Sequence, residues 1–225
     1  ARVALADGRP SEALGLLNGL SAEADLGHIG LLTLARSHAD LGHVDEALDA
    51  YRLASSASGQ TRHAGEIGRL LADAGRSRDA IEVYTLAIAG EPDRVDLRMG
   101  LCELFLATGD RSGAVDQLRK VVHQEPGRAD ARHLLARLNG EAGDHRAAAQ
   151  QLQAILALDG SDAKAMAGLA RAYLETGQAA SSLETYKQAL ALSGETADLL
   201  AGLARAHEPL GQAGKARSAY HRALR

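Results

Sequence analysis

Residues 163–196 read AKAMAGLARAYLETGQAASSLETYKQALALSGET. On both sides of Gly177, apolar residues recur at spacings of about three, four and seven, which place them on one face of a helix. A glycine after an apolar helical stretch favours a left-handed stop, so we expect one helix to end at Gly177 and another to follow it. The stretch therefore predicts a pair of antiparallel helices, helix A before the glycine and helix B after it.

The same pattern recurs along the whole chain. Successive glycines at intervals of 34, 33, 34, 34, 34 and 34 residues are Gly8, Gly42, Gly75, Gly109, Gly143, Gly177 and Gly211. When each glycine is numbered as position 15 of a repeat, positions 8 and 20 carry small side chains, as two closely packed helices require. Position 24 carries a leucine or a tyrosine in every repeat: Leu17, Tyr51, Tyr84, Leu118, Leu152, Tyr186 and Tyr220. This period indicates a single array of stacked repeats.

The pattern resembles the tetratricopeptide repeat, a helix-turn-helix motif of about 34 residues with small side chains at fixed positions. In residues 163–196 the resemblance rests on Leu169, Ala170, Tyr173, Gly177, Tyr186 and Ala189, with Ser182 where alanine is usual. It implies an all-α, right-handed superhelical solenoid of about 6.5 stacked antiparallel helix pairs. The expected repeats, the first and last of them partial, are 1–27, 28–60, 61–94, 95–128, 129–162, 163–196 and 197–225.

Neither end of the array carries a polar capping helix. We therefore expect the chain to be a segment of a longer protein and to be capable of end-to-end self-association. Arg98 and Arg132 stand at position 4, where a large apolar residue is usual, and Pro209 falls near the end of the last helix A. We expect looser packing at the two arginines and a bent helix at the proline. Polar residues that follow the turn glycines, expected to cap helices B, are Ser11, Asp45, Ser77, Asp110 and Asp144.

Composition excludes several partners. The 225 residues contain 25 Lys and Arg against 29 Asp and Glu, which leaves a net charge of -4 and no basic excess for nucleic acid. No apolar run of about 18 residues is present, so we expect no membrane insertion. No secretion signal is visible, which favours the cytoplasm; a periplasmic location would need a signal removed before Ala1.

No constellation of residues supports catalysis. The nine histidines are scattered, and the single cysteine, Cys102, stands at the small-residue position 8, where a thiol serves as a packing group. The glycines do not cluster into a phosphate-binding loop. We therefore expect a protein that is not an enzyme and that binds no cofactor and no metal.

Position 9 is the one column of the repeat that packing does not explain. It is glutamate once, at Glu103, and otherwise arginine: Arg36, Arg69, Arg137, Arg171 and Arg205. The resemblance implies that positions 2, 5, 6, 9, 12 and 13 of helix A face a concave groove. An arginine fork suits carboxylates, so these five residues are the candidate binding site for a partner. Small residues at positions 5 and 6 predict a groove floor open to a peptide backbone.

The arginines have an alternative role. An acidic residue stands four positions after four of them, so each could simply pair along its own helix, with Asp40, Asp73, Glu141 and Glu175. Such pairs are weak, and a ligand carboxylate could compete with them.

The favoured function is a non-catalytic interaction scaffold whose groove binds a protein or peptide, acidic if the arginines are used. One alternative is a partner-recruiting or substrate-recruiting arm of a larger enzyme, such as a glycosyltransferase, or of a polysaccharide or secretion machine. Another is a structural spacer with an empty groove.

Overall fold

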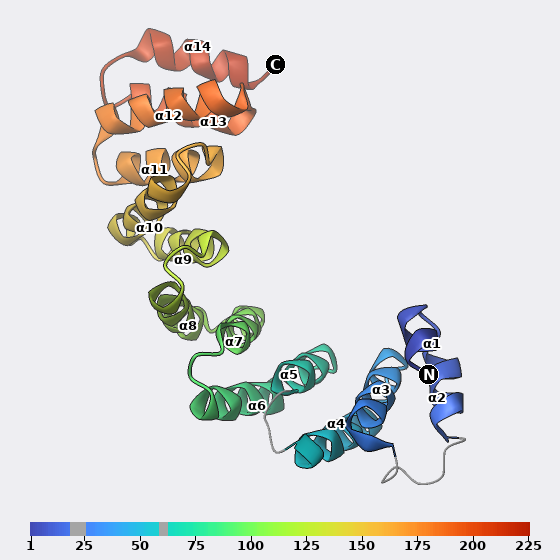
Figure 1. Ribbon diagram of the computed structural model, residues 1–225. Coiled ribbons are helices and arrows are strands. Elements are labelled where there is room, and N and C mark those ends of the chain that lie inside the picture. The colour runs from blue at the N-terminus through green and yellow to red at the C-terminus, as the bar shows by residue number, and fades with distance from the viewer. Residues whose placement is uncertain (19–25, 59–62) are drawn as a thin grey trace. The chain divides into compact units, whose positions relative to one another are not determined.

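A computed structural model describes residues 1–18, 26–58 and 63–225, and all regular secondary structure in these parts is helical. The chain divides into two compact units, Ala1–Asp110 and Arg111–Arg225. The helices of the first unit are α1 (Arg2–Ala6), α2 (Pro10–Asn18), α3 (Gly27–Asp40), α4 (Val44–Ser58), α5 (Ala64–Asp73), α6 (Ser77–Gly90) and α7 (Val95–Thr108) (Figure 1). Those of the second unit are α8 (Arg111–Gln124), α9 (Ala129–Glu141), α10 (His145–Leu158), α11 (Ala163–Glu175), α12 (Ala179–Ser193), α13 (Ala197–His207) and α14 (Ala213–Ala223).

Each unit is built from helix pairs joined at the glycines of the period. All seven of these glycines have a positive φ, between 70° and 84°, which confirms the predicted left-handed turns. In the first unit α3 packs on α4 and α5 on α6, and in the second α9 packs on α10, α11 on α12 and α13 on α14. Helices A are thus α3, α5, α7, α9, α11 and α13.

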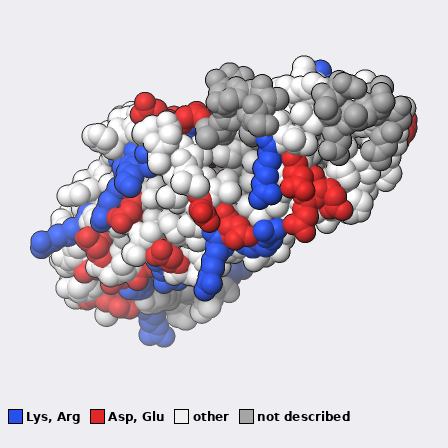
Figure 2. All heavy atoms as spheres, turned by 90° about the horizontal axis from the view of Figure 1, so that it is seen from below, with Lys and Arg blue, Asp and Glu red and all other residues white. Residues whose placement is uncertain are grey.

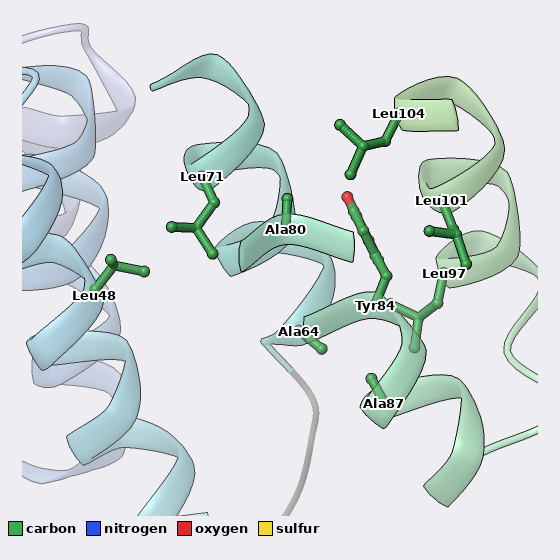
Figure 3. Close-up of a cluster of buried hydrophobic side chains, with 9 residues drawn as sticks. All are labelled: Leu48, Ala64, Leu71, Ala80, Tyr84, Ala87, Leu97, Leu101 and Leu104. Atoms are coloured by element: carbon green, nitrogen blue, oxygen red, sulfur yellow. The ribbon is translucent and has the colours of Figure 1, made fainter. Parts of the chain in front are cut away.

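Small and large side chains interlock between the helices. Ala80, at position 20, is fully buried in a cluster with Tyr84 and the leucines of α7. Figure 3 shows Tyr84 of α6 in this cluster, with its hydroxyl end directed toward Leu104 of α7. Each repeat therefore shares its apolar core with the next helix A, which is how a solenoid buries a face that a single helix pair leaves exposed.

The two arginines at position 4 are held by the turns that precede their helices. Both turns share the pattern Glu-Pro-x-Arg-x-Asp-x-Arg. The buried Arg98 guanidinium donates to the carbonyl oxygen of Pro92 from Nε at 3.2 Å and from Nη2 at 2.8 Å. Arg132 donates to the carbonyl of Pro126 at 2.8 Å and to Gln151 at 2.7 Å. The predicted loosening at Arg98 and Arg132 is wrong, because each guanidinium finds an acceptor within its own turn.

Pro209 ends its helix instead of bending it. The helix α13 stops at His207, so the predicted bend is wrong. Pro209 has no backbone N–H with which to continue the helical hydrogen bonds, and its ring clashes with the preceding turn. Glu208, the residue before it, still has right-handed helical angles, with φ -60° and ψ -55°.

The predicted caps are confirmed at Asp144, whose carboxylate accepts from the amide of Ala147 at 3.0 Å. Ser11, Asp45 and Ser77 lie within the first turn of their helices instead of preceding them. None of the helices in the described parts of the chain has the length and apolar character needed to cross a membrane.

Candidate functional site

All five arginines of position 9 are exposed on helices A. Arg36 lies on α3 and Arg69 on α5 in the first unit; Arg137 lies on α9, Arg171 on α11 and Arg205 on α13 in the second. Figure 2 shows basic and acidic side chains next to each other on the face drawn there. Three of the five arginines, Arg36, Arg137 and Arg205, form ion pairs with glutamates.

Only one of the four predicted pairs along a helix is present among the described residues. Arg137 bonds to Glu141 at 3.0 Å, as the spacing predicts. Arg36 instead contacts Glu66 on the next helix A, and Arg205 contacts Glu175 on the preceding one at 2.9 Å. Two arginines of the column, Arg36 and Arg205, thus pair with glutamates of a neighbouring repeat. The spacing of residues within one helix does not predict such pairs.

Arg171 differs from its neighbours. Its predicted partner, Glu175, is engaged by Arg205. Within residues 1–18, 26–58 and 63–225, Arg171 makes no ion pair and no hydrogen bond through its guanidinium. Its charge is therefore not paired with any carboxylate of the residues that the structure describes.

A groove in the second unit brings three of the candidate arginines together. It has a volume of about 810 Å³ and is lined by helices A, namely α9, α11 and α13. Arg137, Arg171 and Arg205 all line it, which matches the groove-facing place that position 9 was expected to have. Arg36 and Arg69 lie in the first unit and are not part of this groove.

The floor of the groove is closed by side chains from helix B. A Cβ atom added to Gly202 would lie 2.3 Å from the ring of Tyr186, and one added to Gly168 would lie 3.1 Å from Leu152. These glycines make room for the residue at position 24 of the preceding repeat. The prediction that they leave the floor open to a peptide backbone is therefore wrong for Gly202, where an aromatic ring fills the space.

Tyr186 is the groove residue that the sequence analysis missed as a functional candidate. It lines the groove between α11 and α13, and its hydroxyl makes no hydrogen bond within the described parts of the chain. Burial raises the pKa of Tyr186, and the charges of Arg171 and Arg205 oppose that shift. The recurrence of tyrosine at position 24, opposite glycine at position 6 of the next repeat, was the available signal.

One edge of the groove is fixed by a histidine and an acid. His133 Nε2 lies 2.8 Å from Oδ2 of Asp162, while Oδ1 of the same carboxylate accepts from the amide of Ala165 and so caps α11. Burial alone would raise the pKa of Asp162, but these hydrogen bonds lower it overall. The ionised carboxylate therefore anchors α11 against α9.

The remaining chemistry-bearing residues fit packing roles. Cys102 is fully buried, and burial raises the pKa of its thiol to about 11, so very little thiolate forms at neutral pH. Among the described residues, no group of three His, Cys, Asp or Glu side chains is arranged to hold a metal ion.

Comparison with known proteins identifies the family. A tetratricopeptide repeat model matches residues 71–138 and 141–187, and a second one matches residues 167–225. The chain belongs to the tetratricopeptide repeat family. A search of curated proteins finds no match.

Solved structures with the same fold include three repeat proteins. MamA from Desulfovibrio magneticus RS-1 is 18% identical with a TM-score of 0.64, over 73% of this chain and 93% of MamA. A tetratricopeptide repeat protein from Parabacteroides merdae ATCC 43184 is 17% identical with a TM-score of 0.59, over 99% and 89% of the two chains. YrrB, a TPR protein with an unusual peptide-binding site, is 14% identical with a TM-score of 0.67, over 77% and 90%. This likeness confirms the predicted tetratricopeptide solenoid fold.

Proposed function

We propose that this protein is a non-catalytic scaffold whose second unit binds an acidic, extended segment of a partner protein. Stacked helical repeats generally present concave surfaces to partners. The observation that carries the proposal is the joint placement of Arg137, Arg171 and Arg205 along one groove of about 810 Å³. Arginine retains its charge and donates in parallel to both oxygens of a carboxylate, so a row of arginines selects for acidic side chains.

The groove also explains why a segment is favoured over a small molecule. Its lining spans three helices A, and the three arginines come from three successive repeats. A single carboxylate cannot reach all of them, whereas an extended peptide presents side chains at intervals. The side chains of Arg137 and Arg205 are 56% and 50% exposed, and those of their glutamate partners are 35% exposed, so a ligand can compete for both arginines.

Charge reversal tests this proposal. In Arg137→Glu combined with Arg171→Glu, the affinity for a fluorescein-labelled Glu-Gly-Ser repeat peptide should fall by about tenfold or more, and its salt dependence should shrink, because attraction becomes repulsion. Fluorescence anisotropy at low and high salt measures both quantities. The matched control is Arg119→Glu with Arg146→Glu, which makes the same change in net charge on α8 and α10. Equal losses in the two double variants would show that only net charge matters, and would refute groove binding.

A further inference from the structure

The first unit contains a carboxylate that is already bound by the repeat's own arginine and lies close to the tyrosine of position 24. Arg36, at position 9, contacts the carboxylate of Glu66, which stands at position 6 of the next helix A. The ring of Tyr51, at position 24, stacks on the ring of His63, whose Nδ1 lies 3.6 Å from the Glu66 carboxylate. Burial raises the pKa of Tyr51, and the charge of Glu66 raises it further. Positions 9, 24 and 6 of adjacent repeats therefore lie close together around one carboxylate.

The second unit repeats this set without an acidic residue at position 6. Arg171 stands at position 9 and Tyr186 at position 24, whereas position 6 of the next helix A is Gly202. Gly202 supplies no carboxylate, and the Arg171 guanidinium and Tyr186 hydroxyl are both without hydrogen-bond partners in the described portion of the chain. Both residues and Gly202 line the groove, so the missing carboxylate can come from outside.

The step between α5 and α7 shows why glycine at position 6 is not sufficient to create a place for an external carboxylate. There the set is Arg69, Tyr84 and Gly100, but the Tyr84 hydroxyl donates to the carbonyl of Gly65 at 3.2 Å. The next position 9 is Glu103, whose charge already acts on Tyr84. In the second unit the corresponding residue is Arg205, whose positive charge acts on Tyr186, as does the negative charge of its ion-pair partner Glu175. The step between α11 and α13 thus combines two arginines and one glutamate with a tyrosine hydroxyl that has no hydrogen-bond partner among the described residues.

We propose that Arg171 and Tyr186, assisted by Arg205, form a pocket for one carboxylate of the bound segment, which takes the place that Glu66 occupies beside Arg36 and Tyr51. This inference rests on the proposed function and makes it specific. The groove extends from the pocket to α9, where Asp130 lines it. It therefore has room for the segment that carries the carboxylate, and we assign the ligand group to the side chain of an Asp or Glu inside that segment.

Point variants that keep the packing test the pocket. The probe is an acetylated, amidated Glu-Gly-Ser repeat peptide with fluorescein, measured by anisotropy. Arg171→Gln should lower the affinity for the peptide by about tenfold, because it removes a charged hydrogen-bond donor. Tyr186→Phe should lower it by about threefold, because it removes an uncharged donor. Arg171→Lys should lie between Arg171→Gln and the unchanged protein, since it keeps the charge but loses the fork. Tyr84→Phe and Arg146→Gln are the matched controls and should bind within about twofold of the unchanged protein.

Each outcome separates the pocket from the groove. Circular dichroism and the thermal midpoint of Tyr186→Phe establish that its ring still packs on Gly202. If Tyr186→Phe binds the peptide as tightly as the unchanged protein while the double charge reversal still weakens binding, the pocket is refuted and groove binding stands. If the unchanged protein does not bind the Glu peptide, both proposals fail. A Gln-Gly-Ser peptide with a free C-terminus that binds equally well would assign the pocket to a chain end and overturn the side-chain assignment.

Discussion

Gly202 illustrates how one residue serves packing and binding together. The ring of Tyr186 lies where a Cβ atom of residue 202 would be, at 2.3 Å. The missing side chain therefore lets a tyrosine from helix B reach the groove, and it also removes the carboxylate that Glu66 supplies at the same position in the first unit. The absence of one side chain therefore both makes room for the Tyr186 ring and leaves no carboxylate at this position of the repeat.

This geometry predicts opposite effects for two glycine substitutions. Gly202→Ala should lower the free energy of unfolding by about 1–3 kcal/mol, because the added methyl forces the Tyr186 ring to move in a packed core. Gly140, also near the groove on a helix A, has nothing within 4 Å of its Cβ position. Gly140→Ala should therefore stabilise the protein by about 0.5 kcal/mol through helix propensity alone. Urea unfolding followed by circular dichroism compares the two, and equal effects would contradict the close contact.

At this scale the sequence predicted which residues face the groove, but not what they contact. Position 9 and its arginines could be assigned from the period. The contact of Arg36 with Glu66 could not, because it joins residues 30 positions apart and depends on how closely two helices A approach. The role of Tyr186 was missed for the same reason, since the reach of a side chain across an interface is not a property of its own helix.

At the scale of elements, a side chain of the following helix stabilises the turn between two repeats through hydrogen bonds. The Arg98 guanidinium closes the turn before α7 by donating twice to the Pro92 carbonyl. Only 7% of the Arg98 surface is exposed, whereas Pro92 is exposed, so these hydrogen bonds are partly buried. They satisfy donors of a guanidinium that has little access to water.

Removing this contact should therefore destabilise the first unit. Arg98→Met keeps most of the aliphatic stem but not the donors, and should lower the free energy of unfolding by about 1–3 kcal/mol. Arg132→Met is the matched variant in the second unit, where the arginine is only partly buried, and its effect should be smaller. Thermal unfolding of both variants makes the comparison. A larger loss for Arg132→Met would show that burial of the donor does not set the effect.

Helix ends were harder to predict than helix existence. The period placed every turn glycine, but helix caps depend on short-range geometry that several nearby residues can satisfy. Asp162 and Thr196, which accept from Ala165 and Leu199 and cap α11 and α13, were not predicted. The sequence showed Pro209 correctly as a disruption, yet only the structure distinguishes a helix that bends from one that ends.

At the scale of the whole molecule, a repeat array distributes stability among neighbouring helices. Each repeat gains its stability from adjacent repeats, so residues distant in sequence contribute little to one another directly. This is why the period, together with the resemblance to the tetratricopeptide repeat, predicted the fold class: one interface, repeated, defines the architecture. The same reasoning predicts that a site built within one unit depends mainly on that unit.

A fragment comparison follows from this locality. All the lining residues of the groove, including Arg137, Arg171, Tyr186 and Arg205, belong to the unit Arg111–Arg225. Residues 111–225 produced alone should fold cooperatively and bind the Glu-Gly-Ser peptide within about twofold of the whole chain. Residues 1–110 should bind it with an affinity lower by at least about tenfold, because Arg36 is already engaged by Glu66.

Circular dichroism and anisotropy on the two fragments measure folding and binding separately. A helical, cooperatively unfolding fragment 111–225 that has lost affinity would mean that the acidic segment also needs contacts from the first unit. Comparable affinity in both fragments would mean that any exposed arginine of the column suffices. The proposed pocket requires a folded fragment 111–225 that retains its affinity and a fragment 1–110 that binds weakly. Only that result agrees with a peptide carboxylate binding beside Gly202, where the repeat supplies no carboxylate of its own.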